Sequence, residues 1–338
     1  MANRDVVAIG ASSGGIEALL FLAKHFPANF PASVLVTVHL AREFNSSLDE
    51  ILSRAGPLKV QFATDGQPLR KSCIYLAPPD RHLLLNGDYL QLGSGPRENN
   101  FRPAVDAMLR STALCCGGRA IGVILTGTMG DGASGLWALH TCGGITVVQD
   151  PNDAKFSEMP ETALARITPE HVVPLSEMPE LLVRQVNQPA VETRVVPQTL
   201  KLEVDIARGG GFHMDKMDKL GHRSVLACPD CHGVMWEINE DLLTRYRCHV
   251  GHTYTAELMS VALDESVQAG LASASRALEE RLTLARKLQK EASQRGQEGI
   301  ATMWFQRARE YDREMRVLRD AIQKMGAVRA KAELASSD

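Results

Sequence analysis

The fold is decided by residues 6–25, whose sequence is VVAIGASSGGIEALLFLAKH. The apolar run Val6–Ile9 has the length of a buried strand, and a helix-like segment follows it at Ile16–His25. A short glycine-rich turn joins the two. This order predicts a strand that leads directly into a helix, which is the repeating unit of parallel α/β sheets.

The same alternation continues to about residue 185. Further strands are predicted at Ser33–His39, Cys73–Ala77, Ala120–Thr126 and Ile145–Gln149, helices at Pro103–Cys115 and Ala133–His140, and a hairpin from His82–Leu85 and Tyr89–Leu92. We therefore expect an α/β fold with a doubly wound, largely parallel sheet and helices on both faces.

Composition narrows the class of protein. The chain has 338 residues, 44% of them hydrophobic, and a net charge of -3, so nothing favours nucleic acid or an anionic membrane as a partner. The run at Val6 is too short for a signal peptide, and no apolar stretch reaches the roughly 18 residues of a spanning helix. The seven cysteines are an odd number, which argues for reduced thiols. We expect a cytoplasmic protein without membrane insertion.

One candidate nucleophile lies in the first turn. Gly10-Ala-Ser-Ser-Gly14 matches the G-x-S-x-G pattern, in which a strand-to-helix turn exposes a serine and points backbone N–H groups at an oxyanion. The serine is Ser12. Taken alone, the pattern fits a phosphate-binding loop or a plain tight turn equally well.

Two more polar side chains are predicted at the same edge of the sheet. His39 ends the strand that begins at Ser33, and Asp131 follows the strand Ala120–Thr126. Because the carboxyl ends of parallel strands share one edge, both should lie close to Ser12. Singly, His39 would be a core histidine and Asp131 a turn or N-cap residue. Together with Ser12 they predict a nucleophile, its base and the partner that orients the base.

The chain order of these residues is Ser, His, Asp, whereas α/β-hydrolases have Ser, Asp, His, so that fold is not indicated. Several ordered motifs instead resemble the catalytic domain of the chemotaxis protein-glutamate methylesterases, the CheB-type enzymes, over about residues 5–185. These motifs are VAIGASSGG at 7–15, VHL at 38–40, RPAVD at 102–106, ILTGTMGDG at 124–132 and EMP at 158–160.

The resemblance implies hydrolysis of γ-glutamyl methyl esters on methylated chemoreceptor helices, with deamidation of selected receptor glutamines as an additional activity and no catalytic cofactor. It implies that Ser12 attacks the ester carbonyl. His39 would take the proton of Ser12 and later give it to the departing methanol, and Asp131 would hold the imidazole.

Four further residues are candidates for oxyanion or substrate binding. Backbone N–H groups near Ser13 and Thr128 would be the oxyanion donors by position, although the family often has methionine where Thr128 stands. Met159 belongs to a segment that resembles the one beside the family's site. Arg102 would bind an acidic receptor surface, or Pro103 places it as a structural arginine at a helix start.

Familiar members of this family carry an N-terminal phosphoreceiver domain that covers the site, whereas this sequence begins at the catalytic strand. We expect either a constitutively open domain or control by a separate regulator or receiver-domain protein.

A second cluster suits a metal ion. A C-x-x-C pair is followed by a Cys and a His that could close a tetrahedral zinc site. Gly251 favours His252 over His249 as the fourth ligand, and some methylesterase-like chains have a similar segment; unmetallated thiols are the alternative. With four protein ligands and no open position, the zinc would be structural. The candidate ligands are Cys228, Cys231, Cys248 and His252.

Four segments are predicted: a methylesterase-like catalytic domain at 1–187, an extended linker at 188–225, a zinc-knuckle module at 226–255 and a helical hairpin or coiled-coil tail at 256–338. In the tail, apolar residues step by four and three from Trp304 to Met325, a seam that needs a partner helix. Residues 278–292 are the economical partner, and self-association through these helices is the alternative. We expect the knuckle and the hairpin to form a docking or oligomerisation unit.

Two other functions compete with the esterase. One is a non-catalytic or differently targeted esterase fold that scaffolds a signalling complex through its zinc and helical module. The presence of Ser12, His39 and Asp131 argues against a loss of activity. The other is nucleotide binding by the doubly wound sheet, but G-x-G-x-x-G is missing after the first strand.

Overall fold

The structure is a computed structural model that describes residues 3–39, 47–194, 196–210, 217–240 and 243–335. It divides into two compact units, Met1–Met259 and Ser260–Asp338. We describe each unit by itself.

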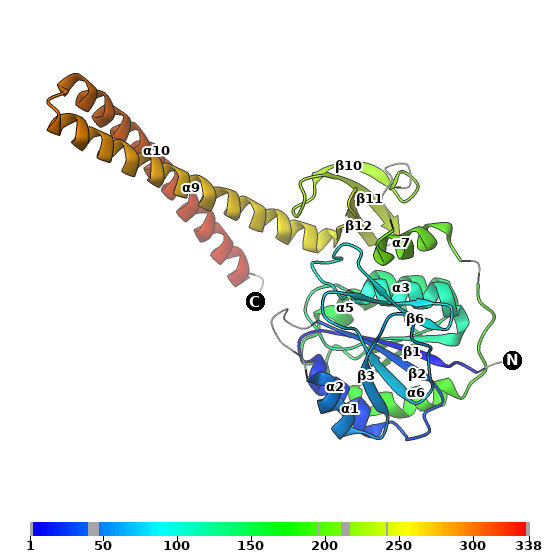
Figure 1. The fold of residues 1–338 in the computed structure, drawn as a ribbon. Helices are drawn as coiled ribbons and strands as arrows, with labels where there is room; N and C mark the ends of the chain where they lie inside the picture. Colours follow the sequence, from blue (N-terminus) through cyan, green and yellow to red (C-terminus); the bar gives the residue numbers. More distant parts are fainter. Residues whose placement is uncertain (1–2, 40–46, 195, 211–216, 241–242, 336–338) are drawn as a thin grey trace. The chain divides into compact units, whose positions relative to one another are not determined.

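A seven-stranded sheet lies at the centre of the first unit, in the order β3-β4-β2-β1-β7-β8-β9 (Figure 1). Every neighbouring pair in it is parallel, which confirms the predicted α/β class. Two further strands, β5 (His82–Asn86) and β6 (Tyr89–Gly93), form the predicted hairpin. The strands of the sheet are β1 (Val6–Ala11), β2 (Ser33–Val38), β3 (Lys59–Phe62), β4 (Cys73–Leu76), β7 (Ala120–Ile124), β8 (Ile145–Gln149) and β9 (His171–Val173).

Helices cover both faces of the sheet because its strands are apolar on both sides. Along β1, Ala8 belongs to the hydrophobic cluster on one face and Ile9 to the cluster on the other, as the two-residue period of a strand requires. The first face is covered by α3 (Val105–Cys116), α4 (Ala133–Thr141) and α5 (Glu158–Leu164). The second face is covered by α1 (Gly15–His25), α2 (Leu48–Ala55) and α6 (Met178–Val186).

The strand order reverses next to β1, where the candidate residues lie. From β1 the chain crosses to β2 on one side, and β7 pairs with β1 on the other side. In such sheets, ligands bind at the carboxyl ends of the strands where the order reverses. Close packing at this point requires Gly10, because a Cβ there would lie 2.2 Å from Cγ1 of Val105 on α3.

The segment predicted as an extended linker, 188–225, differs from that prediction. It contains α7 (Gln198–Arg208), in which Leu200 and Val204 are buried in the same cluster as α3. These residues are four positions apart, so they share one face of a helix. Gly209 ends α7 in a left-handed conformation, with φ of 99°.

The Cys/His segment folds as a four-stranded antiparallel sheet, in the order β10-β11-β12-β13. Its strands are β10 (His222–Ala227), β11 (Val234–Glu240), β12 (Leu243–Cys248) and β13 (Thr253–Thr255). We call residues 222–255 the Cys/His module. It belongs to the same compact unit as the seven-stranded sheet.

Two long helices, α9 (Ala256–Gln294) and α10 (Glu298–Ala335), form the predicted helical hairpin. Within the second unit, Leu282 and Ala285 of α9 pack with Ala308 and Met315 of α10. The predicted seam ends earlier than expected, because Ile322 and Met325 are 37% and 46% exposed. None of the helices in the described ranges is both long and apolar enough to cross a membrane.

Candidate active site

The structure brings Ser12, His39 and Asp131 together at the carboxyl edge of the sheet. Ser12 Oγ lies 3.1 Å from His39 Nδ1, and His39 Nε2 lies 2.9 Å from Asp131 Oδ2. The imidazole is stacked on the ring of Phe101, with centroids 3.5 Å apart and planes 4° apart. The histidine thus connects a hydroxyl to a carboxylate, and the stacking limits its rotation.

Backbone hydrogen bonds hold the first two residues in place. Ser12 directly follows β1, and its N–H donates to the carbonyl of Thr126. His39 directly follows β2, and its N–H donates to the carbonyl of Ala11. The turn after Ser12 is made possible by Gly14, whose φ of 75° suits glycine. Both side chains therefore extend from strand ends that the sheet fixes.

The carboxylate of Asp131 is fully buried and accepts several hydrogen bonds. The backbone N–H groups of Val105 and Asp106, in the first turn of α3, donate to it at 2.6 and 3.2 Å, and Asn99 Nδ2 donates at 3.0 Å. Burial raises the pKa of Asp131. The hydrogen bond and charge of His39, together with the bonds from Val105 and Asn99, outweigh that effect and hold the pKa below its ordinary value. The group is therefore an anion that can stabilise a protonated imidazole.

Asn99 and Asp106 support this carboxylate and were not among the predicted site residues. Asn99 Nδ2 also donates to Asp106 Oδ2 at 2.9 Å, so one amide joins two buried carboxylates. Asp106 Oδ1 accepts from the N–H groups of Gly132 and Gly135, which flank the start of α4. The RPAVD motif contains Asp106 and could have indicated it, whereas nothing in the sequence indicates Asn99.

The candidate oxyanion residues lie beside Ser12. The hydroxyls of Ser13 and Thr128 are 3.2 Å apart. The loop that carries Thr128 lies over the nucleophile, because a Cβ on Gly127 would be 2.7 Å from Cβ of Ser12. This places two backbone segments around Ser12 from different strand ends.

Met159 is buried beside the loop that carries Thr128. Its side chain is only 1% exposed and belongs to the core cluster, and its N–H donates to the carbonyl of Gly127. As an apolar residue at the start of α5 it packs on the sheet, and its contact with substrate stays a prediction. Met159 supports the loop that carries Thr128.

Arg102 lies in a cavity whose lining includes Val38, the residue before His39. The cavity has a volume of about 400 Å³ and is lined by Val38, Ala77, Pro79, Asp80, Arg97, Arg102 and Pro103. Arg102 is paired with Asp80, at 2.7 Å, and donates to the carbonyl of Gly95. These bonds fit the structural role that was one of the two alternatives for Arg102, while its place in the cavity fits the other.

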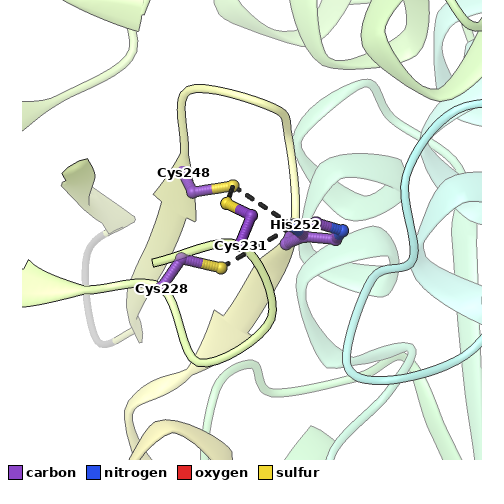
Figure 2. A group of neighbouring side chains, drawn as sticks. All are labelled: Cys228, Cys231, Cys248 and His252. Carbon is purple, nitrogen blue, oxygen red and sulfur yellow. Dashed lines mark hydrogen bonds between the residues drawn. The ribbon is translucent and has the colours of Figure 1, made fainter. Parts of the chain in front are cut away.

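The four candidate metal ligands converge at one end of the Cys/His module (Figure 2). The ligand atoms of Cys228, Cys231, Cys248 and His252 all lie within 4.8 Å of one another. Cys231 Sγ is 3.6 Å from Cys248 Sγ, and His252 Nδ1 is 3.4 Å from Cys248 Sγ. Tetrahedral zinc with bonds of ~2.3 Å separates its sulfur ligands by roughly 3.8 Å, so the group fits such an ion. His249 packs instead against Gly233, where a Cβ would lie 1.9 Å from its ring.

Comparisons with known proteins agree on one family. A family model described as CheB methylesterase matches residues 7–182. Protein-glutamate methylesterase/protein-glutamine glutaminase 2 of Rhizobium johnstonii is 35% identical over 185 residues, which are 53% of this chain and 50% of that protein. Protein-glutamate methylesterase/protein-glutamine glutaminase 4 of Myxococcus xanthus is 39% identical over 174 residues, which are 51% and 49% of the two chains. The chain thus spans about half the length of the curated relatives it matches.

A solved structure is similar over the same region. The crystal structure of the Thermotoga maritima CheB methylesterase catalytic domain matches with a TM-score of 0.52 and 31% sequence identity. The match covers 54% of this chain and 98% of that one, so it includes nearly all of that domain.

Proposed function

The chain belongs to the CheB methylesterase family, and on that premise we propose that it is a protein-glutamate methylesterase. Its substrates are methyl esters on glutamate side chains of chemoreceptor helices, and deamidation of receptor glutamines is a second activity. The observation that carries the proposal is the contact of His39 with Ser12 on one side, at 3.1 Å, and with Asp131 on the other, at 2.9 Å.

The first step forms an acyl-enzyme. The Nε2–H of His39 donates to Asp131, which leaves Nδ1 without a proton and facing the hydroxyl of Ser12. As Ser12 Oγ attacks the ester carbonyl, its proton passes to Nδ1. The carboxylate of Asp131 stabilises the imidazolium that results. Backbone N–H groups near Ser13 and Thr128 stabilise the oxyanion of the tetrahedral intermediate.

The second step regenerates the enzyme. The intermediate collapses by breaking the bond to the methoxy oxygen, which takes the proton from His39 and leaves as methanol. Water then attacks the acyl-enzyme, and His39 removes its proton and returns one to Ser12. With a glutamine substrate the leaving group is ammonia, and both substrates give the free glutamate.

A receptor helix with several glutamates is acidic, and the cavity that Val38 lines carries the cations of Arg97 and Arg102 together with the carboxylate of Asp80. This supports a substrate whose neighbouring carboxylates are bound while its ester reaches Ser12. Because Asp80 pairs with Arg102 and offsets part of its charge, we assign Arg97 the larger part of this attraction.

The proposal is tested by measuring methanol release from methylated chemoreceptor fragments. Ser12→Ala removes the nucleophile, and we expect a loss on the order of 10⁴-fold because the three residues act as a unit. Ser53→Ala, at an exposed position on α2, is the matched control and should keep the wild-type rate. Release at the wild-type rate by Ser12→Ala would refute the proposed nucleophile.

We also propose that Cys228, Cys231, Cys248 and His252 bind a structural zinc ion. Elemental analysis of protein purified without chelators should give about one zinc per chain. Cys231→Ser should lose the metal, whereas Cys115→Ser, which changes a cysteine outside the cluster, should retain it. Metal-free wild-type protein would contradict this assignment.

A further inference from the structure

The loop that carries Asn99 connects the candidate triad to the Cys/His module. We call residues 97–101 the Asn99 loop. Asn99 itself is fully buried, and its amide bonds both Asp131 and Asp106. Its φ of 52° lies in the left-handed region, so the loop has to be held in this conformation. What holds the loop decides where the amide points.

The first anchor of the loop is strand β13. The N–H of Asn99 donates to the carbonyl of Thr253 at 2.7 Å, and the N–H of Thr253 donates to the carbonyl of Arg97 at 3.4 Å. Glu98 and Thr253 thereby form an isolated parallel bridge. Thr253 follows His252 directly, so the strand that receives the loop begins at a candidate metal ligand.

The second anchor is a buried ion pair. The carboxylate of Glu98 is 1% exposed and pairs with Arg110 of α3 and with Arg247 of β12, the latter at 3.2 Å. Arg247 is fully buried and also pairs with Glu203 of α7. Arg247 precedes Cys248 directly, so this anchor too lies next to a candidate ligand.

We infer that Asn99 is a positioning residue for Asp131, and that the Cys/His module holds Asn99 in place through Thr253 and Arg247. The module is then a part of the active-site scaffold and not a separate docking unit. This inference rests on the proposed esterase function, because it assigns Asn99 a role in that reaction.

The physical reason is electrostatic. Asn99 places a neutral pair of donors between the carboxylates of Asp106 and Asp131, both of which are 1% exposed. Without the amide, two buried carboxyl groups lose the donor that they share. Asp131 then moves relative to His39, and a displacement on the order of 1 Å costs on the order of 100-fold in rate. Since Asn99 is buried, the loss should fall on kcat and leave KM unchanged.

The first test compares two asparagines of the same loop. Asn99→Gly removes the amide and keeps a residue that accepts a positive φ. Asn100→Gly is the matched control, because Asn100 also has a positive φ, of 69°, but its side chain is exposed. We expect Asn99→Gly to lose 10- to 100-fold in kcat for methanol release, and to react more slowly by about the same factor with a fluorophosphonate that labels Ser12. Asn100→Gly should match the wild type in both.

The second test asks whether the module holds the loop, and its readout is independent of activity. Amide hydrogen exchange of residues 97–101 is compared between zinc-loaded wild type and Cys231→Ser, with Cys115→Ser as control. Loss of the ligand should speed exchange at Asn99, whose N–H donates to Thr253. If Cys231→Ser does not fold, Glu98→Gln is used instead, because it leaves all four ligands intact and weakens the pair with Arg247.

The outcomes separate the two proposals. Suppose that the wild type reacts with receptor fragments and with the fluorophosphonate. An Asn99→Gly variant with the same kcat as the wild type would then overturn the positioning role alone. Unchanged exchange of residues 97–101 in Cys231→Ser, or in Glu98→Gln, would overturn the role of the module. Wild type that reacts neither with receptor fragments nor with the fluorophosphonate would overturn the esterase function, and the positioning role with it.

Discussion

At the scale of single residues, the two ring nitrogens of His39 contact different partners. Nδ1 faces Ser12 and Nε2 faces Asp131, the reverse of the arrangement in which Nε2 acts as the base. Either nitrogen can serve, because the carboxylate fixes the tautomer by accepting the proton of the other nitrogen. The stacked ring of Phe101 keeps the imidazole in this orientation.

His82 is a second buried histidine, and it leads to a prediction about pH. Its side chain is fully buried, Nε2 donates to the carbonyl of Pro96, and Nδ1 accepts from the N–H of Ala104. Burial is the main cause that lowers the pKa of His82 from 6.5 to about 4. The imidazole therefore stays neutral in the folded protein, where it joins a loop to the start of α3.

The unfolded chain takes up a proton at His82 below pH 6.5, whereas the folded chain does so only near pH 4. The contribution of His82 to the free energy of unfolding is thus complete above pH 6.5 and is lost as the pH falls towards 4, about 3 kcal/mol in all. We expect urea unfolding of His82→Asn to depend less on pH in this window than that of the wild type. His222→Asn, at an exposed position, is the control, and equal pH dependence of His82→Asn and wild type would contradict the prediction.

The candidate site could be predicted only where its residues follow strands. Ser12, His39 and Asp131 each come after an apolar run, so the shared edge of a parallel sheet brings them together. Asn99 lies in a loop, 32 positions from Asp131, and no periodicity connects them. Its role depends on a fold that the sequence pattern does not specify.

At the scale of elements, α7 shows why a helix can be missed when only the sequence is considered. The segment 188–225 has scattered apolar residues and three consecutive glycines, which suggested an extended linker. Leu200, Val204 and Ala207 share one helical face and Leu202 and Ile206 another, but so short an apolar pattern beside glycines does not by itself distinguish a helix from a loop. The deciding interaction is burial against α3, a contact that no local pattern reveals.

The burial of α7 can be measured. Leu200→Ala should lower the free energy of unfolding by about 2–5 kcal/mol, because Leu200 is 4% exposed and its removal leaves a cavity. Lys201→Ala, at an exposed position of the same helix, should change it by less than about 0.5 kcal/mol. Urea unfolding measures both. A loss below about 1 kcal/mol for Leu200→Ala would mean that α7 does not pack as described.

The strand β12 was missed for a related reason. Arg245 and Arg247 are two positions apart, so they lie on the same face of the strand, and both are fully buried. Their carboxylate partners are Glu203 and Glu98, which lie 42 to 149 positions earlier in the chain. A buried arginine can be predicted from sequence only when its carboxylate partner is recognised as well, and here that partner lies far away in the sequence.

At the scale of the whole molecule, the fold class was predictable from the sequence. The alternation of strands and helices specifies a parallel sheet, since the connections in it are local. Long-range contacts such as Glu98–Arg247 join the Cys/His module to the rest of the first unit, and these are not readable from local sequence. A change in composition marks a boundary in the sequence, but tertiary contacts decide whether the segments on its two sides fold as separate units.

The hairpin unit has its own core, so its stability should be independent of the activity of the catalytic unit. Leu282→Asp places a charge where the side chain is 5% exposed, which should destabilise the hairpin by several kcal/mol. Leu284→Asp is the matched control, because Leu284 lies on the same helix and is 55% exposed. In a thermal melt followed by circular dichroism, Leu282→Asp should lose helix at a lower temperature than the wild type, and Leu284→Asp should not. Methanol release should be the same in both variants, and a joint loss of helix and activity would contradict independence.

The ion pair between Glu98 and Arg247 has a consequence for chimaeras that combine parts of this chain with parts of a relative. The two residues are 149 positions apart, yet each is buried against the other. A recombinant gene that took residues 198–259 from this chain and its catalytic half from a relative without Glu98 would leave Arg247 with one carboxylate fewer. A chimaera of this kind should therefore be less stable than one whose catalytic half supplies a carboxylate at the position of Glu98.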